Sequence, residues 1–191
     1  MSKNKLSKKE KKSKNNKNKS EKKWILTIIM FTMVISGTVS LLSEATLSKV
    51  NIYLALIILF SIICLGVVFD IIGTAVTAGN EIPFHSMASK RIPEARLAVN
   101  LIRNASKVSN FCNDVIGDVA GIISGSVGVV IVEKINLIFP NINYVIIATL
   151  ISAVIAAMTV GGKALGKKFA ISQSNNIIFT VAKILYFVKR G

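Results

Sequence analysis

One stretch decides the fold class of this chain: residues 50–78, VNIYLALIILFSIICLGVVFDIIGTAVTA. Its first 20 residues, Val50 to Phe69, carry no charge, and 20 residues of α-helix rise about 30 Å, the thickness of a bilayer's hydrocarbon core. The apolar pattern continues past Asp70 towards Ala78. The stretch therefore predicts a membrane-spanning helix. The whole chain agrees, because 52% of its 191 residues are hydrophobic and only 17% are charged.

Three further apolar segments predict additional spans. Residues 24–43 carry no charge, residues 115–132 are interrupted only by Asp118, and residues 144–160 follow a polar loop or interfacial segment. A secretory signal peptide is the alternative for residues 24–43, but the long charged tail before them favours an uncleaved helix. We expect an all-α integral membrane protein with four transmembrane helices and amphipathic juxtamembrane helices.

The N-terminal tail, residues 1–23, contains 11 lysines and only two apolar residues, so it is predicted to be disordered. A net charge of +15 could indicate nucleic-acid binding. However, no aromatic residue interrupts the tail, and no DNA- or RNA-binding motif follows it. A polybasic run directly before a span fits anionic membrane lipid better, so we expect a lipid partner and no nucleic acid.

The distribution of lysine and arginine predicts the orientation. With four spans and the tail inside, 22 of the 24 basic residues fall on the cytoplasmic side, as the positive-inside rule requires. Both termini are therefore expected in the cytoplasm. The lysine- and asparagine-rich composition is typical of a low-GC bacterium, which predicts a bacterial cytoplasmic membrane.

Two segments are too polar to span but alternate apolar and basic residues at helical spacing. Residues 82–109 carry Pro83 and Pro93, which favour the starts of short helices over helix interiors. Residues 164–190 combine apolar positions with basic ends. Both segments predict juxtamembrane helices at the inner surface of the membrane.

Polar side chains form a stripe on each of two predicted spans. On the first, positions i, i+4, i+7 and i+11 are Asp70, Thr74, Thr77 and Glu81; on the second, the series is Asp114, Asp118, Gly121, Gly125 and Gly128, with Asn113 beside it. A carboxylate in hydrocarbon costs several kcal/mol unless it is protonated, paired or hydrated. Carboxylate, amide and hydroxyl oxygens suit Mg²⁺, so the stripes predict a polar inter-helical cavity. Ordinary helix packing through the glycines is the alternative.

The order of these parts resembles the transmembrane domain of the CNNM/CorC (CorB) family, which is linked to Mg²⁺ and Co²⁺ transport. Residues 78–81, Ala-Gly-Asn-Glu, resemble that family's Ser-Gly-x-Glu. Residues 116–118, Ile-Gly-Asp, resemble its Gly-Asn motif, with Asp118 in place of asparagine. Residues 162–167, Gly-Lys-Ala-Leu-Gly-Lys, resemble its Gly-Glu-x-x-Pro-Lys, with Lys163 in place of glutamate.

The resemblance covers residues 52–188 and implies a divalent-cation transporter or transporter-like module. Transferred to this sequence, the resemblance makes Asp118 the carboxylate ligand and makes Thr77 and Asn113 neutral oxygen ligands. Asp70 would be a nearby charge, and Glu81 would be a helix cap or an ion-steering group at the inner mouth. It also implies a homodimer. Mg²⁺ is the expected bound or transported ion, and no cofactor is expected. The regulatory CBS pair usual in the family is not expected here, because the 191 residues leave no room for it.

A second hypothesis is a non-transporting scaffold or partner subunit that keeps the fold, which the altered motifs favour. The sequence contains no Cys/His or Ser/His/Asp constellation, no HExxH motif and no Walker loop. We therefore do not expect an enzyme.

Overall fold

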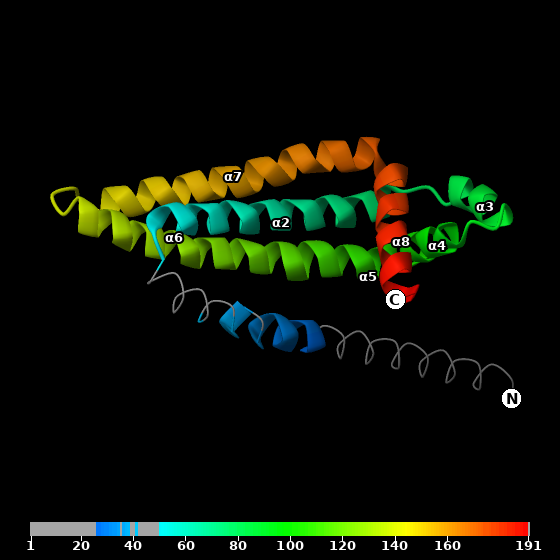
Figure 1. Cartoon of the computed structure of the whole chain (residues 1–191), viewed down its shortest axis with the longest axis horizontal. Coiled ribbons are helices and arrows are strands. Elements are labelled where there is room, and N and C mark those ends of the chain that lie inside the picture. The colour runs from blue at the N-terminus through cyan, green and yellow to red at the C-terminus, as the bar shows by residue number, and fades with distance from the viewer. Residues whose placement is uncertain (1–25, 35, 39–40, 42–49, 191) are drawn as a thin grey trace, which may run out of the picture. The chain divides into compact units, whose positions relative to one another are not determined.

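A computed structural model of the chain describes residues 26–34, 36–38, 41 and 50–190 (Figure 1). The chain divides into two compact units, residues 1–38 and residues 39–191. In the first unit, the described residues form a short apolar helix, Leu26–Thr38. This helix coincides with part of the predicted span at 24–43. Apart from Leu41, the rest of that prediction and the lysine-rich tail lie outside the described residues.

In the second unit, three helices are long and apolar enough to cross a membrane. The first is α2 (Ile52–Ala78), and the third is α7 (Tyr144–Ser172). The second is a continuous helix, Ala105–Ile138, built from α5 (Ala105–Asn110), a π-helix η1 (Phe111–Gly117) and α6 (Asp118–Ile138). Figure 1 shows the three running alongside one another. The described residues confirm the predicted all-α fold, and these three helices, long and apolar enough to cross a membrane, correspond to three of the four predicted spans.

Small residues bring α2 close to both of its neighbours. A Cβ atom added to Gly66 of α2 would lie 3.0 Å from the Cβ of Ala120 on α6. On the other side, a Cβ on Gly162 of α7 would lie 2.9 Å from Val67 of α2, and one on Gly166 would lie 2.8 Å from Ile71. The glycines therefore permit close helix approach, which is how van der Waals packing drives association in lipid. The packing alternative raised from the sequence concerned Gly121, Gly125 and Gly128. Of these three, Gly128 lies against α7, where an added Cβ would be 2.5 Å from Cδ1 of Ile155, whereas a Cβ on Gly121 or Gly125 would meet no atom within 4 Å.

Three shorter helices pack at one end of the bundle: α3 (Ile82–Ser89), α4 (Pro93–Arg103) and α8 (Ser174–Arg190). Figure 1 shows α8 crossing the ends of the long helices, with α3 and α4 beyond it. A buried cluster joins them to the end of α2; its members are Val76, Phe84, Ala98, Val99, Ile178 and Ala182. As predicted, Pro83 and Pro93 lie in the first turns of α3 and α4.

The turn from α3 to α4 reverses the chain within four residues. Arg91 has a φ of 62°, the left-handed conformation that usually favours glycine. Its backbone N–H donates to the carbonyl of Ala88, and the N–H of Ile92 donates to the carbonyl of Met87. This pattern is a Schellman motif, which satisfies the last carbonyls of α3 and sets the direction of α4.

The sequence predicted one juxtamembrane helix over residues 164–190, but the structure divides this basic segment between two helices. Residues 164–172 continue α7, and a separate helix begins at Ser174 after the break at Gln173. At the other end of α7, the side chain of Asn143 accepts a hydrogen bond from the N–H of Val145, a standard N-terminal cap.

Candidate cation site

Two buried polar oxygens lie at the contact between α2 and η1. Asp70 is only 4% exposed, and its Oδ2 atom has no hydrogen-bond partner. The Oδ1 atom of Asn113 is also buried without a partner, while its Nδ2 donates to Oγ of Ser109 at 3.3 Å. Buried polar atoms in folded proteins are nearly always hydrogen-bonded, so two unsatisfied oxygens at one interface make this contact the candidate site.

The register of the two helices places these oxygens at nearby levels. Gly73 of α2 lies against Asn113, so closely that a Cβ on Gly73 would overlap the carboxamide oxygen. Gly66 lies against Ala120 further along the same antiparallel contact. Positions 66, 70 and 73 share one face of a helix, because they are spaced four and three residues apart. Asp70 therefore lies on the face that contacts η1, between two fixed points of that contact.

The π-helix itself marks this level of the bundle. Seven residues, Phe111–Gly117, depart from α-helical geometry inside an otherwise regular 34-residue helix. Such π-segments occur frequently at functional sites, because they rotate the side chains that follow them relative to a regular helix. Here the segment contains Asn113, and Asp118 begins α6 directly after it.

Asp118 lies apart from this pair and has a basic partner. Its carboxylate is 66% exposed, and its Oδ1 lies 3.8 Å from Nζ of Lys163 on α7, a side chain that is 23% exposed. Asp118 thus faces α7 and the open side of the bundle, whereas Asn113 faces α2. The structure gives Asp118 a contact with Lys163 and none with Asp70 or Asn113.

Thr77 and Glu81 are engaged elsewhere. Thr77 is exposed, and its hydroxyl donates to the backbone carbonyl of Thr74 at 2.8 Å. Glu81 lies beyond the end of α2, in the turn before α3. Neither side chain therefore reaches the buried oxygens of Asp70 and Asn113 through any contact that the structure gives.

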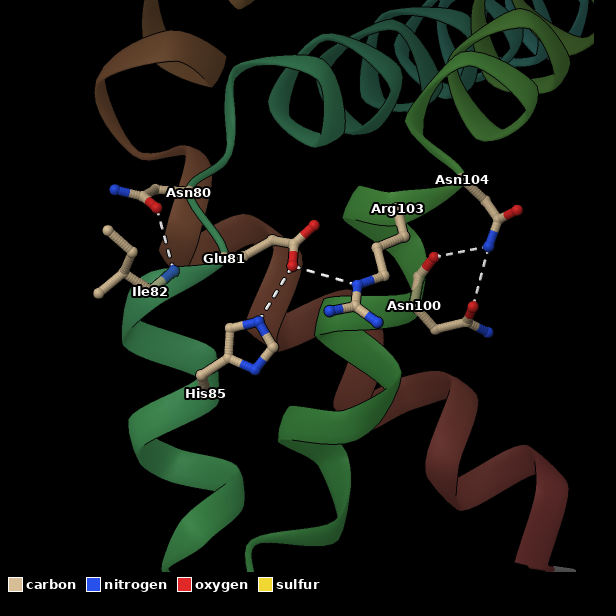
Figure 2. Close-up of polar contacts among 7 residues, drawn as sticks. All are labelled: Asn80, Glu81, Ile82, His85, Asn100, Arg103 and Asn104. Carbon is tan, nitrogen blue, oxygen red and sulfur yellow. Dashed lines mark hydrogen bonds and ion pairs between the residues drawn. The ribbon is translucent and has the colours of Figure 1, made fainter.

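Glu81 is the centre of a polar cluster at the end of the bundle (Figure 2). Its Oε2 accepts hydrogen bonds from Nε2 of His85 at 3.0 Å and from Nε of Arg103 at 3.2 Å. The hydrogen bond from His85, with a contribution from Arg103, holds the pKa of Glu81 below its ordinary value. Beside it, the N–H of Asn80 donates to Oδ1 of Asn175 on α8. The cluster therefore connects α3 with α4, and the adjacent turn with α8.

The lowered pKa of Glu81 predicts a pH effect on this cluster. A depressed pKa in the folded protein means that the ionised carboxylate stabilises the fold above the ordinary pKa of glutamate, and that this contribution is lost as the pH falls through the lower value. Thermal unfolding of the parent protein should therefore lose more stability below about pH 4.5 than that of Glu81→Gln. Identical pH profiles of the two proteins would contradict the assignment.

The cavity that all three long helices line is apolar rather than polar. It has a volume of about 390 Å³ and lies towards the α6–α7 turn, away from Asp70. Its lining residues are Leu56, Leu59, Phe60, Ile63, Ile131, Ile135, Leu150, Ile151, Val154, Ile155 and Met158. Within the part of the chain that the structure describes, no three His, Cys, Asp or Glu side chains gather as a metal site.

Lys163 is paired with Asp118, which sequence reasoning did not predict. The sequence showed it only as a basic residue at the end of the last span and as a replacement for an acid in the resembling motif. Its position beside Gly162 was the signal from which a lysine at a helix contact could have been predicted.

Comparison of the chain with known protein families, with characterised proteins and with solved structures finds no match.

Proposed function

We propose that this protein is a transporter-like membrane module that binds a divalent cation, such as Mg²⁺ or Co²⁺, between α2 and η1. Asp70 supplies the carboxylate and Asn113 a neutral oxygen. The observation that carries the proposal is the pair of buried oxygens without hydrogen-bond partners on facing helices. An acceptor pair of this kind is completed by a cation, which is electron-deficient, more readily than by an anion.

The chemistry of the two side chains selects the class of ion. Mg²⁺ binds oxygen and keeps several of its waters, so one carboxylate and one amide oxygen are a sufficient protein contribution. Soft metals prefer thiolate or imidazole ligands. The short motifs resembling the CNNM/CorC family support the same class of ion.

The wider setting of the module is part of the proposal. It comprises a fourth span at residues 24–43, both termini in the cytoplasm of a bacterium, a lysine-rich tail on anionic lipid of the cytoplasmic membrane, and assembly as a homodimer. The supporting observations are the basic residues concentrated on one predicted side and the open glycine face of α6. A Cβ on Gly121 or Gly125 would meet no atom within 4 Å, so another helix can approach there. No enzymatic step is proposed.

A non-transporting scaffold is the second candidate, and a specific observation favours it. Two of the predicted ligands already have partners: Asp118 pairs with Lys163, and Glu81 pairs with His85 and Arg103. A protein that neutralises its own carboxylates needs no ion to do so. The scaffold candidate predicts saturable binding of another membrane protein and no cation binding that depends on Asp70.

Cation binding by Asp70→Asn tests the proposed function. Mn²⁺ replaces Mg²⁺ at oxygen sites and is visible by electron paramagnetic resonance. Asparagine keeps an oxygen ligand but removes the charge, so we expect at least about tenfold weaker Mn²⁺ binding by the purified protein in detergent. Asp114→Asn is the matched control, because Asp114 is an exposed carboxylate on η1. Equal Mn²⁺ affinity of the parent and Asp70→Asn would rule the site out.

A further inference from the structure

A basic side chain lies at the same level of the bundle as the two unpartnered oxygens. Lys163 follows Gly162, whose backbone packs against Val67 of α2, less than one helical turn from Asp70. Three residues later, Gly166 packs against Ile71. These two contacts fix α7 against α2 on both sides of Lys163. The start of its side chain is therefore held in place by the backbone packing.

The ammonium group of Lys163 extends towards α6. Its Nζ lies 3.8 Å from Oδ1 of Asp118 and 3.4 Å from where a Cβ on Gly117 would be. Because Gly117 has no side chain, the ammonium can lie against the helix backbone there. Lysine suits this arrangement, since its charge is compact and is carried by a flexible four-carbon stem.

The pairing changes what Asp118 can bind. Asp118 lies on a helix that is long and apolar enough to span a membrane, and two-thirds of its side chain is exposed. An unpaired carboxylate there is costly, so it needs a counter-charge. Lys163 already supplies one, and a second cation at the same carboxylate would be repelled by the ammonium.

We infer that Lys163 acts as a tethered counter-ion, which occupies the cation position at Asp118 and keeps a diffusible divalent cation away from it. The inference rests on the proposed function and deepens it, because it names the group that competes with the ion at this level. A diffusible cation reaches Asp118 only when the lysine side chain swings away. Binding in the parent protein is therefore confined to Asp70 and Asn113.

Titration of the parent and four full-length variants with Mn²⁺ tests the inference. Lys163→Met removes the charge at similar length, Lys163→Arg keeps the charge, and Lys163→Met with Asp118→Asn removes both partners. Lys167→Met is the control, because Lys167 is an exposed lysine about one turn further along α7. We expect Lys163→Met to bind Mn²⁺ at least about tenfold more tightly than the parent or to gain a second site. The gain should be absent from the other three proteins.

The inference is overturned if Lys163→Met binds Mn²⁺ as the parent does, if Lys163→Arg gains equally, or if the gain survives Asp118→Asn. Gel filtration and thermal unfolding establish that each variant is folded, and Lys163→Gln replaces Lys163→Met if the latter is not folded.

Asp70→Asn tests the proposed function separately. If Asp70→Asn loses binding while Lys163→Met gains none, only the inference fails. If the parent binds no Mn²⁺ but Lys163→Met does, the proposed site fails and the tethered counter-ion stands.

Discussion

Phe84→Ala is expected to destabilise the juxtamembrane end of the protein by about 3–5 kcal/mol, the range for removing a fully buried phenylalanine from a packed core. Phe84 is 2% exposed, lies in one cluster with Val76, Ala98 and Ile178, and stacks on Phe179 with ring centroids 6.5 Å apart. The deletion would leave a cavity where three short helices meet the end of α2.

Hydrogen exchange and thermal unfolding measure this effect. Backbone amides of α3, α4 and α8 should exchange faster in Phe84→Ala. Amides in the half of α2 that begins at Ile52 should change little. Phe187→Ala is the control, because Phe187 is a phenylalanine of α8 that is 82% exposed. If Phe84→Ala costs no more stability than Phe187→Ala, the cluster is not the core of this end.

Gly73→Val is expected to weaken cation binding about 100-fold or more, since it disturbs both proposed ligands together. A Cβ at residue 73 would overlap the carboxamide oxygen of Asn113 and lie 2.8 Å from its Cγ. The branched side chain forces Asn113 away and pushes η1 from α2, which moves Asp70 relative to its neighbours. Overpacking of this kind typically also costs about 1–3 kcal/mol of stability.

Mn²⁺ affinity and thermal stability should be measured together for this variant. Gly161→Val is the matched control, because a Cβ at Gly161 of α7 would meet no atom within 4 Å. The control carries the same intrinsic cost of valine in a helix. The α2–η1 site is contradicted if Gly73→Val is folded and binds Mn²⁺ as tightly as Gly161→Val.

Much of the fold was predictable because apolar length is a local property of the sequence. The uncharged run from Val50 predicted α2, and the prolines at 83 and 93 predicted the starts of α3 and α4. The end of the last span was less predictable. Residues 164–172 are basic, yet they continue α7, since lysine is a good helix former and its charged end can reach the membrane surface.

The candidate site was only partly predictable because helical spacing assigns residues to faces but not to partners. The stripe through Asp70 was visible in the sequence, and Asn113 was named as a ligand. Their relation through Gly73 depends on the register between two helices about 40 residues apart in the chain. The pairing of Asp118 with Lys163 likewise joins α6 to α7, and no single-helix pattern contains it.

The position of Asp70 along α2 makes the two sides of the membrane unequal for a cation. Asp70 comes eight residues before Ala78, about 12 Å along the helix, but 18 residues after Ile52, about 27 Å. The longer path runs past the apolar cavity lined by residues such as Phe60, Ile131 and Ile155, whose side chains have no oxygen that could replace an ion's water. The proposed site thus lies nearer to the α3–α4 end of the bundle than to the α6–α7 turn. If the proposed transport function holds, a complete cycle would require the helices around this cavity to separate.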